Sequence, residues 1–293
     1  MTETIGWELY RSFLGALQEG SLSGAARALG LTQPTLGRHI SALEAALGQS
    51  LFTRSQSGLL PTEAALALRS HAEAMHNTAA TLERAARGFG TEVQGAVRVS
   101  ASEVVGVEIL PPILAALRQS HPRLEVELVL SNRLADVVHR EVDIAVRMAP
   151  PQQDVLLATR VRDVELGLHA HKSYLERHGR PASLAELTRH ALIGFDVETP
   201  FLRDARKHLP LWKRENFAFR CDSDLGQLAL IRSGAGIGIC QCGLAQVDPR
   251  LTRVLAKAVA VKLPTWVVMH ADLRSSRRCK VVYDTLAKGL RRA

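Results

Sequence analysis

The sequence has few aromatic residues, no long apolar run and no recognisable targeting segment. Phe, Trp and Tyr make up 4% of the 293 residues, so the cores must be built from aliphatic side chains and alanine. No stretch reaches the ~18 uninterrupted apolar residues of a membrane span. The start, MTETIGWELY, lacks the basic segment and apolar run of a signal peptide. These absences predict a cytoplasmic protein with no membrane partner.

Cysteine is also scarce and follows no metal-binding pattern. Cys221, Cys240, Cys242 and Cys279 lie in the last third of the chain without the paired spacing of a zinc site. We therefore expect reduced thiols, no metal and no cofactor. The pair in Cys240-Gln241-Cys242, with Cys221 expected nearby in the fold, leaves redox sensing open as a minor alternative to buried free cysteines.

The basic excess of the chain is unevenly distributed. A net charge of +8 favours a nucleic-acid partner. Residues 1–90, however, contain seven basic and seven acidic side chains, so the whole excess falls later in the chain. Bulk charge therefore does not locate a DNA site, and a motif must do so.

Two short helices joined by a glycine turn are predicted near the N-terminus. Ser21 and Thr32 are suitable N-caps, and Gly30 permits the sharp turn between the helices. An apolar stripe then repeats at helical spacing, through Leu36, Ile40, Leu43 and Leu47. This pattern is typical of a helix-turn-helix, although a small helical bundle with a solvated face would share it.

The polar N-terminal end of the second helix is the part that would enter a major groove. Gln33 and Arg38 carry forked hydrogen-bonding groups that can read base edges, while Pro34 and Thr35 can touch a thymine methyl or a phosphate. His39 is expected on the same outward face, with a more ambiguous role.

The residues after this helix predict a wing. The segment LGQSLFTRSQSGLLPTEA reads as a short strand, a turn at Ser57–Gly58, and a second strand that ends at Pro61. Arg54 on this wing is placed to enter a minor groove or to contact phosphate. A wing favours DNA binding over a plain helical bundle.

The segment from Gly20 to Ala64 resembles the signature of the LysR family of transcriptional regulators. The matching positions are Ala25, Ala26, Gln33, Pro34, Leu36, Arg38, Ile40, Leu43, Glu44, Leu47, Gly48, Leu51, Phe52, Arg54, Thr62, Glu63 and Ala64. One departure is Gly37, where the family usually has serine. The resemblance implies that residues 1–61 form a winged helix-turn-helix domain that binds double-stranded operator DNA in a regulator, not an enzyme.

A long helix is predicted over residues 62–90. Its apolar positions are spaced 4, 3, 4, 3 and 4 apart, as in a coiled-coil seam: Leu68, Ala72, Met75, Ala79, Leu82 and Ala86. The resemblance implies that this helix pairs with a second copy in a homodimer, and that the C-terminal domains double it to a homotetramer. The alternative is a helix that lies alone on its own C-terminal domain.

Residues 91–293 alternate strands and helices, which predicts an α/β domain. Two similar sets, with the chain end returning to the first, resemble the two-lobed periplasmic-binding-protein fold. Lobe I is expected at about 91–161 and 267–293, and lobe II at about 162–266. The resemblance implies that a small-molecule effector binds between the lobes and controls DNA binding.

The effector candidates are polar or aromatic residues at strand ends, where such folds bind ligands: Ser100, Ser102, Asn132, Arg147, Phe195, Asp222 and Ser223. Arg147 and a helix N-terminus at Ser102 favour a small carboxylate. Glu103 opposes an anion, so a neutral polar ligand such as a sugar or phenol is the competing hypothesis.

Two other classes of protein compete with a regulator as interpretations of the sequence. A transported-solute binder would carry a signal peptide and no winged helix. An enzyme would show a metal cluster, a nucleotide-binding glycine loop or a nucleophile elbow, and the sequence has none of these patterns. RNA polymerase is a further candidate partner of such a regulator.

Overall fold

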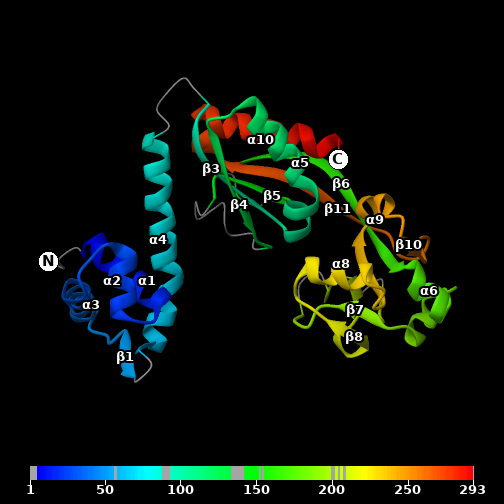
Figure 1. Ribbon diagram of the computed structural model, residues 1–293, viewed down its shortest axis with the longest axis horizontal. Helices are drawn as coiled ribbons and strands as arrows, with labels where there is room; N and C mark the ends of the chain where they lie inside the picture. The colour runs from blue at the N-terminus through cyan, green and yellow to red at the C-terminus, as the bar shows by residue number, and fades with distance from the viewer. Residues whose placement is uncertain are drawn as a thin grey trace. The chain divides into compact units, whose positions relative to one another are not determined.

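The computed structural model describes residues 5–55, 58–87, 93–132, 142–151, 153, 155–198, 202–203, 205–206 and 209–292. The chain forms two compact units, a first that ends at Arg87 and a second that begins at Gly88 (Figure 1). Among the described residues, no helix combines the length and the apolar character needed to cross a membrane.

The first unit is a winged helix-turn-helix with a long helix attached. Its elements are α1 (Trp7–Glu19), α2 (Leu22–Leu29), α3 (Gln33–Leu47), β1 (Phe52–Ser55), β2 (Gly58–Pro61) and α4 (Glu63–Arg87). Phe13, Leu36, Leu43 and Leu51 are fully buried at its centre. The predicted stripe on α3 therefore forms the core, as expected.

Both predicted helix caps are present. The Ser21 hydroxyl accepts a hydrogen bond from the Gly24 N–H at 3.1 Å, and the Thr32 hydroxyl accepts one from the Thr35 N–H at 3.4 Å. Gly30 ends α2 with a φ of 67°, in the left-handed region that glycine adopts readily. These local interactions fix where the two helices begin and how the turn between them runs.

The wing is anchored to the helices at both of its ends. The Glu44 carboxylate on α3 accepts hydrogen bonds from the N–H groups of Leu51 and Phe52, at 2.7 and 3.2 Å. At the other end, the Leu59 N–H donates to the Gly20 carbonyl at 2.8 Å. A Cβ on Gly58, whose φ is 126°, would lie 2.5 Å from that same carbonyl oxygen, so only glycine fits.

The second unit is built on one mixed sheet of nine strands in the order β4-β3-β5-β11-β6-β9-β7-β8, with β10 paired to β6. The strands are β3 (Gly95–Ala101), β4 (Leu124–Leu130), β5 (Ile144–Arg147), β6 (Leu156–His171), β7 (Leu192–Gly194), β8 (Phe217–Arg220), β9 (Ile237–Gln241), β10 (Leu251–Val254) and β11 (Val261–His270). Its helices are η1 (Val105–Ile109), α5 (Leu110–Ser120), α6 (Lys172–His178), η2 (Ala185–Arg189), η3 (Arg214–Asn216), α8 (Asp224–Arg232), α9 (Cys242–Val247), η4 (Ala271–Ser275) and α10 (Arg277–Arg292).

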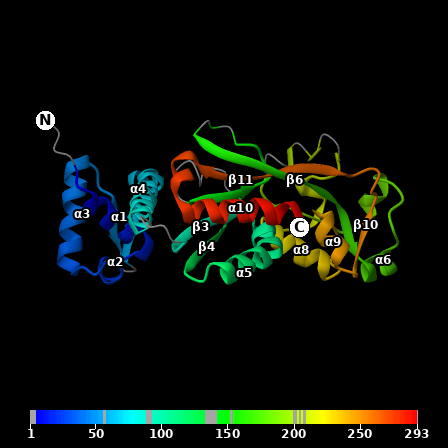
Figure 2. The same ribbon diagram turned by 90° about the horizontal axis from the view of Figure 1, so that it is seen from above.

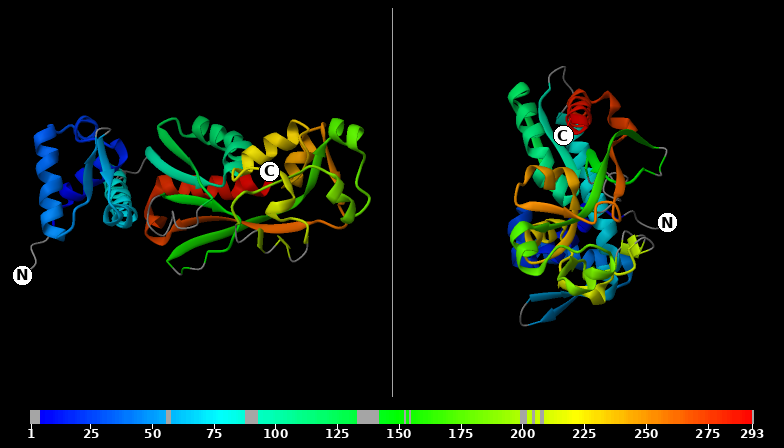
Figure 3. Two further views of the ribbon diagram at one scale, coloured as in Figure 1. Left: turned by 90° about the horizontal axis from the view of Figure 1, so that it is seen from below. Right: turned by 90° about the vertical axis from the view of Figure 1, so that its right-hand side faces the viewer.

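Two long antiparallel strands, β6 and β11, run through both lobes of this unit (Figures 2 and 3). In lobe I, β11 pairs with β5, and in lobe II, β6 pairs with β9. The predicted lobe boundaries at 161 and 266 thus fall inside strands that both lobes share. The predicted two-lobed α/β fold is confirmed.

The end of the chain completes lobe I, as predicted. Val282, Leu286 and Leu290 on α10 are buried against the core that the first strands of the unit form. Figure 2 shows α10 beside α5 over the sheet. Lobe II has its own core, in which Trp212 and Phe217 meet edge to face at 5.2 Å.

One predicted helix changes pitch along its length. The sequence predicts a continuous helix over 104–122, and the structure has helical turns from 103 to 120, of which η1 is π-helical before α5 begins at Leu110. Pro111 and Pro112 have no N–H to continue the α-helical ladder across that junction, which accounts for the change of pitch. The helix predicted over 134–142 lies outside the described residues, except for Val142.

Candidate functional site

The start of α3 is an exposed polar surface. Gln33, Pro34 and Arg38 are exposed and Thr35 is half-buried. The Arg38 guanidinium donates to the Thr35 hydroxyl at 3.4 Å, and that hydroxyl lies 2.8 Å from the Thr32 hydroxyl. The forked side chains predicted to read bases are therefore on the open end of the second helix, next to its cap.

His39 is placed differently from the expected outward position. It is half-buried, and its Nδ1 lies 2.8 Å from the hydroxyl of Ser12, which is itself buried on α1. This hydrogen bond ties α3 to α1, so His39 positions the recognition helix. The heptad-like pattern of α3 alone did not reveal this contact, because its partner lies 27 residues away.

Arg54 and Gly37 are two further positions of the predicted DNA-binding surface. Arg54 lies on β1, with its Cα opposite Leu59 on β2, and its side chain is outside the described residues. A Cβ on Gly37 would meet nothing within 4 Å inside the chain. A serine at that position would therefore fit without disturbing the helix.

The predicted seam on α4 divides into two parts. Ala72 is 3% exposed and belongs to the core of the first unit, and Leu68 packs against the same core. The seam prediction is corrected at Ala72, because packing against the chain's own helices leaves it little surface for a partner, whereas Leu68 is half-buried. Met75 and Leu82 are 41% and 71% exposed, and Ala79 is half-buried. The side chain of Ala86 is outside the described residues.

A cavity of about 540 Å³ lies between the two lobes of the second unit. Its wall is mostly apolar, with polar groups from both lobes: Ser102, Val104, Asn132, Arg147, Met148, Ala149, Leu166, Phe195, Trp212, Asp224, Gln227, Leu228, Ile239, Cys240, Gln241 and Leu263. The size and the few convergent polar groups are typical of a small-molecule site.

Four of the seven predicted effector residues line this cavity: Ser102, Asn132, Arg147 and Phe195. Arg147 is 6% exposed, and its guanidinium donates to the Ser100 hydroxyl at 2.7 Å and to the Val146 carbonyl at 2.9 Å. Ser100 is not part of the wall. Its hydroxyl instead holds the arginine in place.

The other two candidates serve the surrounding structure. The Asp222 carboxylate accepts hydrogen bonds from the backbone N–H groups of Asp196 and Val197, both at 2.9 Å. Ser223 caps α8, and its hydroxyl donates to the Glu103 carboxylate at 2.6 Å. Neither residue is in the cavity wall, so these two predicted positions do not face the space where an effector would bind.

Sequence reasoning missed several wall residues. Asp224, Gln227 and Leu228 come from one face of α8, at helical spacing, and Gln241 ends β9. The i, i+3, i+4 spacing of these residues on α8 could have identified this face of the helix. A search confined to strand ends reaches only the residues just before α8. Nothing in the local pattern singled out Trp212.

Asp224 is the one carboxylate among the described residues of the wall, and its surroundings shift its pKa. Burial raises the pKa of its carboxyl, the hydrogen bond from the Asn132 amide at 3.0 Å lowers it, and the nearby Glu103 carboxylate raises it. Asn132 belongs to lobe I and Asp224 to lobe II, so this hydrogen bond also joins the two lobes within the cavity wall.

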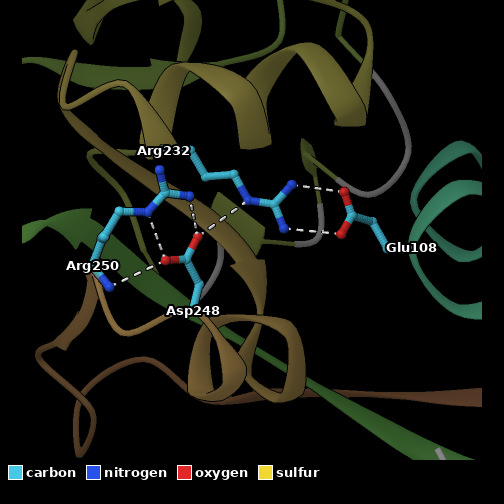
Figure 4. A network of polar contacts seen from close by, with 4 residues as sticks. All are labelled: Glu108, Arg232, Asp248 and Arg250. Carbon is cyan, nitrogen blue, oxygen red and sulfur yellow. Dashed lines mark hydrogen bonds and ion pairs between the residues drawn. The ribbon is translucent and has the colours of Figure 1, made fainter.

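A second set of contacts joins the lobes beside the cavity (Figure 4). Glu108 on η1 faces Arg232 at the end of α8, and Asp248 lies on the other side of that arginine, 3.5 Å from its Nε. Arg250 in turn binds Asp248 through two hydrogen bonds of 2.9 Å and holds the pKa of that carboxyl at about 2.

The cysteines are poor candidates for redox chemistry. Burial raises the pKa of Cys240 to about 12 and also raises the pKa of Cys242. A reactive thiol needs a lowered pKa, because the thiolate is the nucleophile. Among the described residues, no group of His, Cys, Asp and Glu has the arrangement of a metal site.

Comparisons with known proteins agree with this architecture. The family described as "Bacterial regulatory helix-turn-helix protein, lysR family" matches residues 7–66, and "LysR substrate binding domain" matches residues 90–291. The regulator CrgA of Neisseria meningitidis is 27% identical over 95% of both chains. The activator TtdR of Escherichia coli is 29% identical over 92% of this chain and 89% of its own.

Solved structures give the same result for the fold. The structure of CrgA superposes with a TM-score of 0.60 at 25% identity, covering 97% of this chain and 98% of that one. The regulator CbnR, solved in complex with its target DNA, gives 0.64 at 21% identity, covering 98% and 99%.

Proposed function

The chain belongs to the LysR family of transcriptional regulators, and from that premise we propose that it binds an operator as a homodimer under the control of a small molecule in the interlobe cavity. LysR regulators are not enzymes, and they combine a DNA-binding helix-turn-helix with a substrate-binding domain.

The observation that carries the proposal is the exposed polar end of α3, beside a wing. Gln33 and Arg38 are exposed, Pro34 and Thr35 lie next to them, and Ser12 holds the helix through His39. We assign base reading to Gln33 and Arg38, and phosphate or minor-groove contact to Arg54.

The test is a salt titration of DNA binding by single variants. The Arg38→Ala variant should lose ~1–3 kcal/mol on the best duplex selected from a random library and less on bulk random DNA, since Arg38 reads a base. The Arg54→Ala variant should lose affinity for both duplexes and lower the salt slope by about one unit. Arg11→Ala, which removes an exposed cation from α1, is the control. Equal losses for Arg38→Ala on both duplexes would remove it from base reading.

Control by an effector is supported by the cavity and its position between the lobes. A molecule that touches both lobes binds one arrangement of them better than another, and it can shift the protein only as far as those affinities differ. The wall residues Ser102, Asn132, Arg147 and Phe195 are proposed as effector contacts. Ser100, Asp222 and Ser223 are proposed to support them from behind.

The assembly and location follow from the same proposal. Met75, Ala79 and Leu82 are proposed to pair with a second copy, and the second units to double the dimer to a tetramer. A regulator of this class acts where the operator is, so we propose a cytoplasmic location and leave RNA polymerase as a further partner to be sought.

A further inference from the structure

Gln241 is a buried polar side chain in the wall of the interlobe cavity. It is 7% exposed, it lines the interlobe cavity, and its side-chain amide makes no hydrogen bond within the described part of the chain. It ends β9, where its backbone pairs with Leu166, another wall residue. Because the amide belongs to the wall of a cavity and makes no bond within the described chain, its donor and acceptor are available to a molecule bound there.

Gln227, on helix α8, is a second buried glutamine in the cavity wall, and one of its two amide atoms has no partner in the described part of the chain. It is 4% exposed, and its Nε2 donates to the Cys221 carbonyl at 2.8 Å, which fixes the orientation of the amide. Its Oε1 has no hydrogen-bond partner among the described residues and belongs to a side chain in the cavity wall. The two glutamines together offer the cavity a fixed acceptor and an amide that can both donate and accept.

The charges around the cavity do not favour a free anion. Arg147 and Asp224 are its two charged wall residues among those described, and they offset one another. The Arg147 guanidinium is held by the Ser100 hydroxyl and the Val146 carbonyl. Glu103 occupies the N-terminus of α8, where its carboxylate accepts from the Ser223 hydroxyl and lies 3.5 Å from the Leu225 N–H. That helix end is therefore already filled by a carboxylate of the protein itself.

We propose that the effector cavity takes an uncharged, flat, largely apolar molecule with an amide-like donor and acceptor, which Gln241 and Gln227 recognise. Phe195 and Trp212 supply aromatic surface for its apolar body. This assignment rests on the proposed function of the cavity as the effector site. It selects the neutral hypothesis over the carboxylate that Arg147 suggested from sequence.

The test compares benzamide with benzoate, which differ in charge and hardly in shape, on the full-length protein by calorimetry and thermal shift. Benzamide should raise Tm and bind at least tenfold more tightly than benzoate. Gln241→Met should weaken benzamide binding about tenfold or more. It should leave the Tm of the unliganded protein unchanged or higher, because an unpaired amide is replaced by an apolar group. Gln246→Met, at an exposed position on α9, is the matched control and should change neither.

Several results would overturn the assignment: benzoate binding as tightly as benzamide, neither compound binding, or Gln241→Met retaining full benzamide affinity. If Gln241→Met does not fold, Gln241→Asn keeps the amide but withdraws it by one methylene, and it should show the same loss of binding. Without ligand, DNA binding by the Gln246→Met control should match that of the wild type. If benzamide does not bind but DNA binding still depends on Arg38, the proposed class of ligand is wrong and the proposed DNA-binding function stands.

Discussion

The carboxylate of Glu108 in lobe I accepts two hydrogen bonds from the guanidinium of Arg232 in lobe II, at 2.7 and 2.9 Å. The side chains are only 22% and 29% exposed. Arg232 ends α8, and Glu103 of lobe I contacts the start of the same helix. Lobe I thus holds α8 at both ends, and the helix face between them forms part of the cavity wall.

Breaking the Glu108–Arg232 pair should loosen the lobes. Glu108→Gln keeps the shape but removes the charge that Arg232 faces, and we expect a loss of about 1–3 kcal/mol in unfolding free energy. Asp163→Asn, which removes an ion pair with Arg160 whose side chains are 57% and 38% exposed, should cost less than about 1 kcal/mol. Urea unfolding at pH 7 compares the two. Equal costs would show that the pair does not bind the lobes together.

The same pair should depend on pH. The hydrogen bond from Arg232 lowers the pKa of Glu108 below its ordinary value of 4.5. The pair therefore stabilises the fold fully above that value, and this contribution is lost as the pH falls through the lowered pKa. The stability difference between wild type and Glu108→Gln should shrink on acidification below about pH 4, and a constant difference would contradict the assignment.

The exposed part of α4 should hold the dimer. Changing both Met75 and Leu82 to Glu places like charges on the apolar strip and should abolish dimer formation and operator binding, while the second unit stays folded. Leu66→Glu is the matched control, because Leu66 is also exposed, at 54%, but lies on the opposite face of the helix. Light scattering and anisotropy measure both effects. A double variant that remains dimeric and binds DNA normally would rule out this strip.

The sequence predicted most of the first unit because its determinants are local. The caps at Ser21 and Thr32 and the stripe through Leu36 act within a few residues, so their pattern is visible along the chain. His39 and Ala72 were placed less well, since the partners of both are set by how distant helices pack.

The cavity was harder to predict for the same reason. Strand ends led to Arg147 and Phe195, because a sheet brings such ends together. Gln227 and Trp212 reach the wall from a helix face and from the segment before β8, and a rule about strand ends does not cover either. Long-range packing, which one sequence does not display, decides these positions.

The thiols should be inert in the folded protein. Cys240 and Cys242 have raised pKa values and are buried, Cys279 is fully buried, and Cys221 alone is partly accessible. Iodoacetamide at pH 8, followed by intact mass, should add at most one group to the native protein, at Cys221, and four groups after denaturation. Cys221→Ser should remove the native label. A Cys240–Cys242 disulfide that forms with mild peroxide and changes operator binding would restore the redox alternative.

Gly37 should weaken the recognition helix without any structural need for glycine. It lies inside α3, and a Cβ there would meet nothing within 4 Å, so Gly37→Ala should raise the unfolding free energy by ~0.5–1 kcal/mol. Gly24→Ala is the contrasting control, because its Cβ would lie 2.8 Å from the Ser21 hydroxyl that caps α2, and we expect it to destabilise. Urea unfolding of the full chain measures both changes.

Gly37→Ser should in addition alter which duplexes are selected from a random library, because its hydroxyl would project from the helix that we propose reads the groove. If Gly37→Ala destabilises the protein, the helix is strained at this position. If Gly37→Ser selects the same sequences as the wild type, residue 37 does not face DNA, and the orientation assigned to α3 in the groove is wrong.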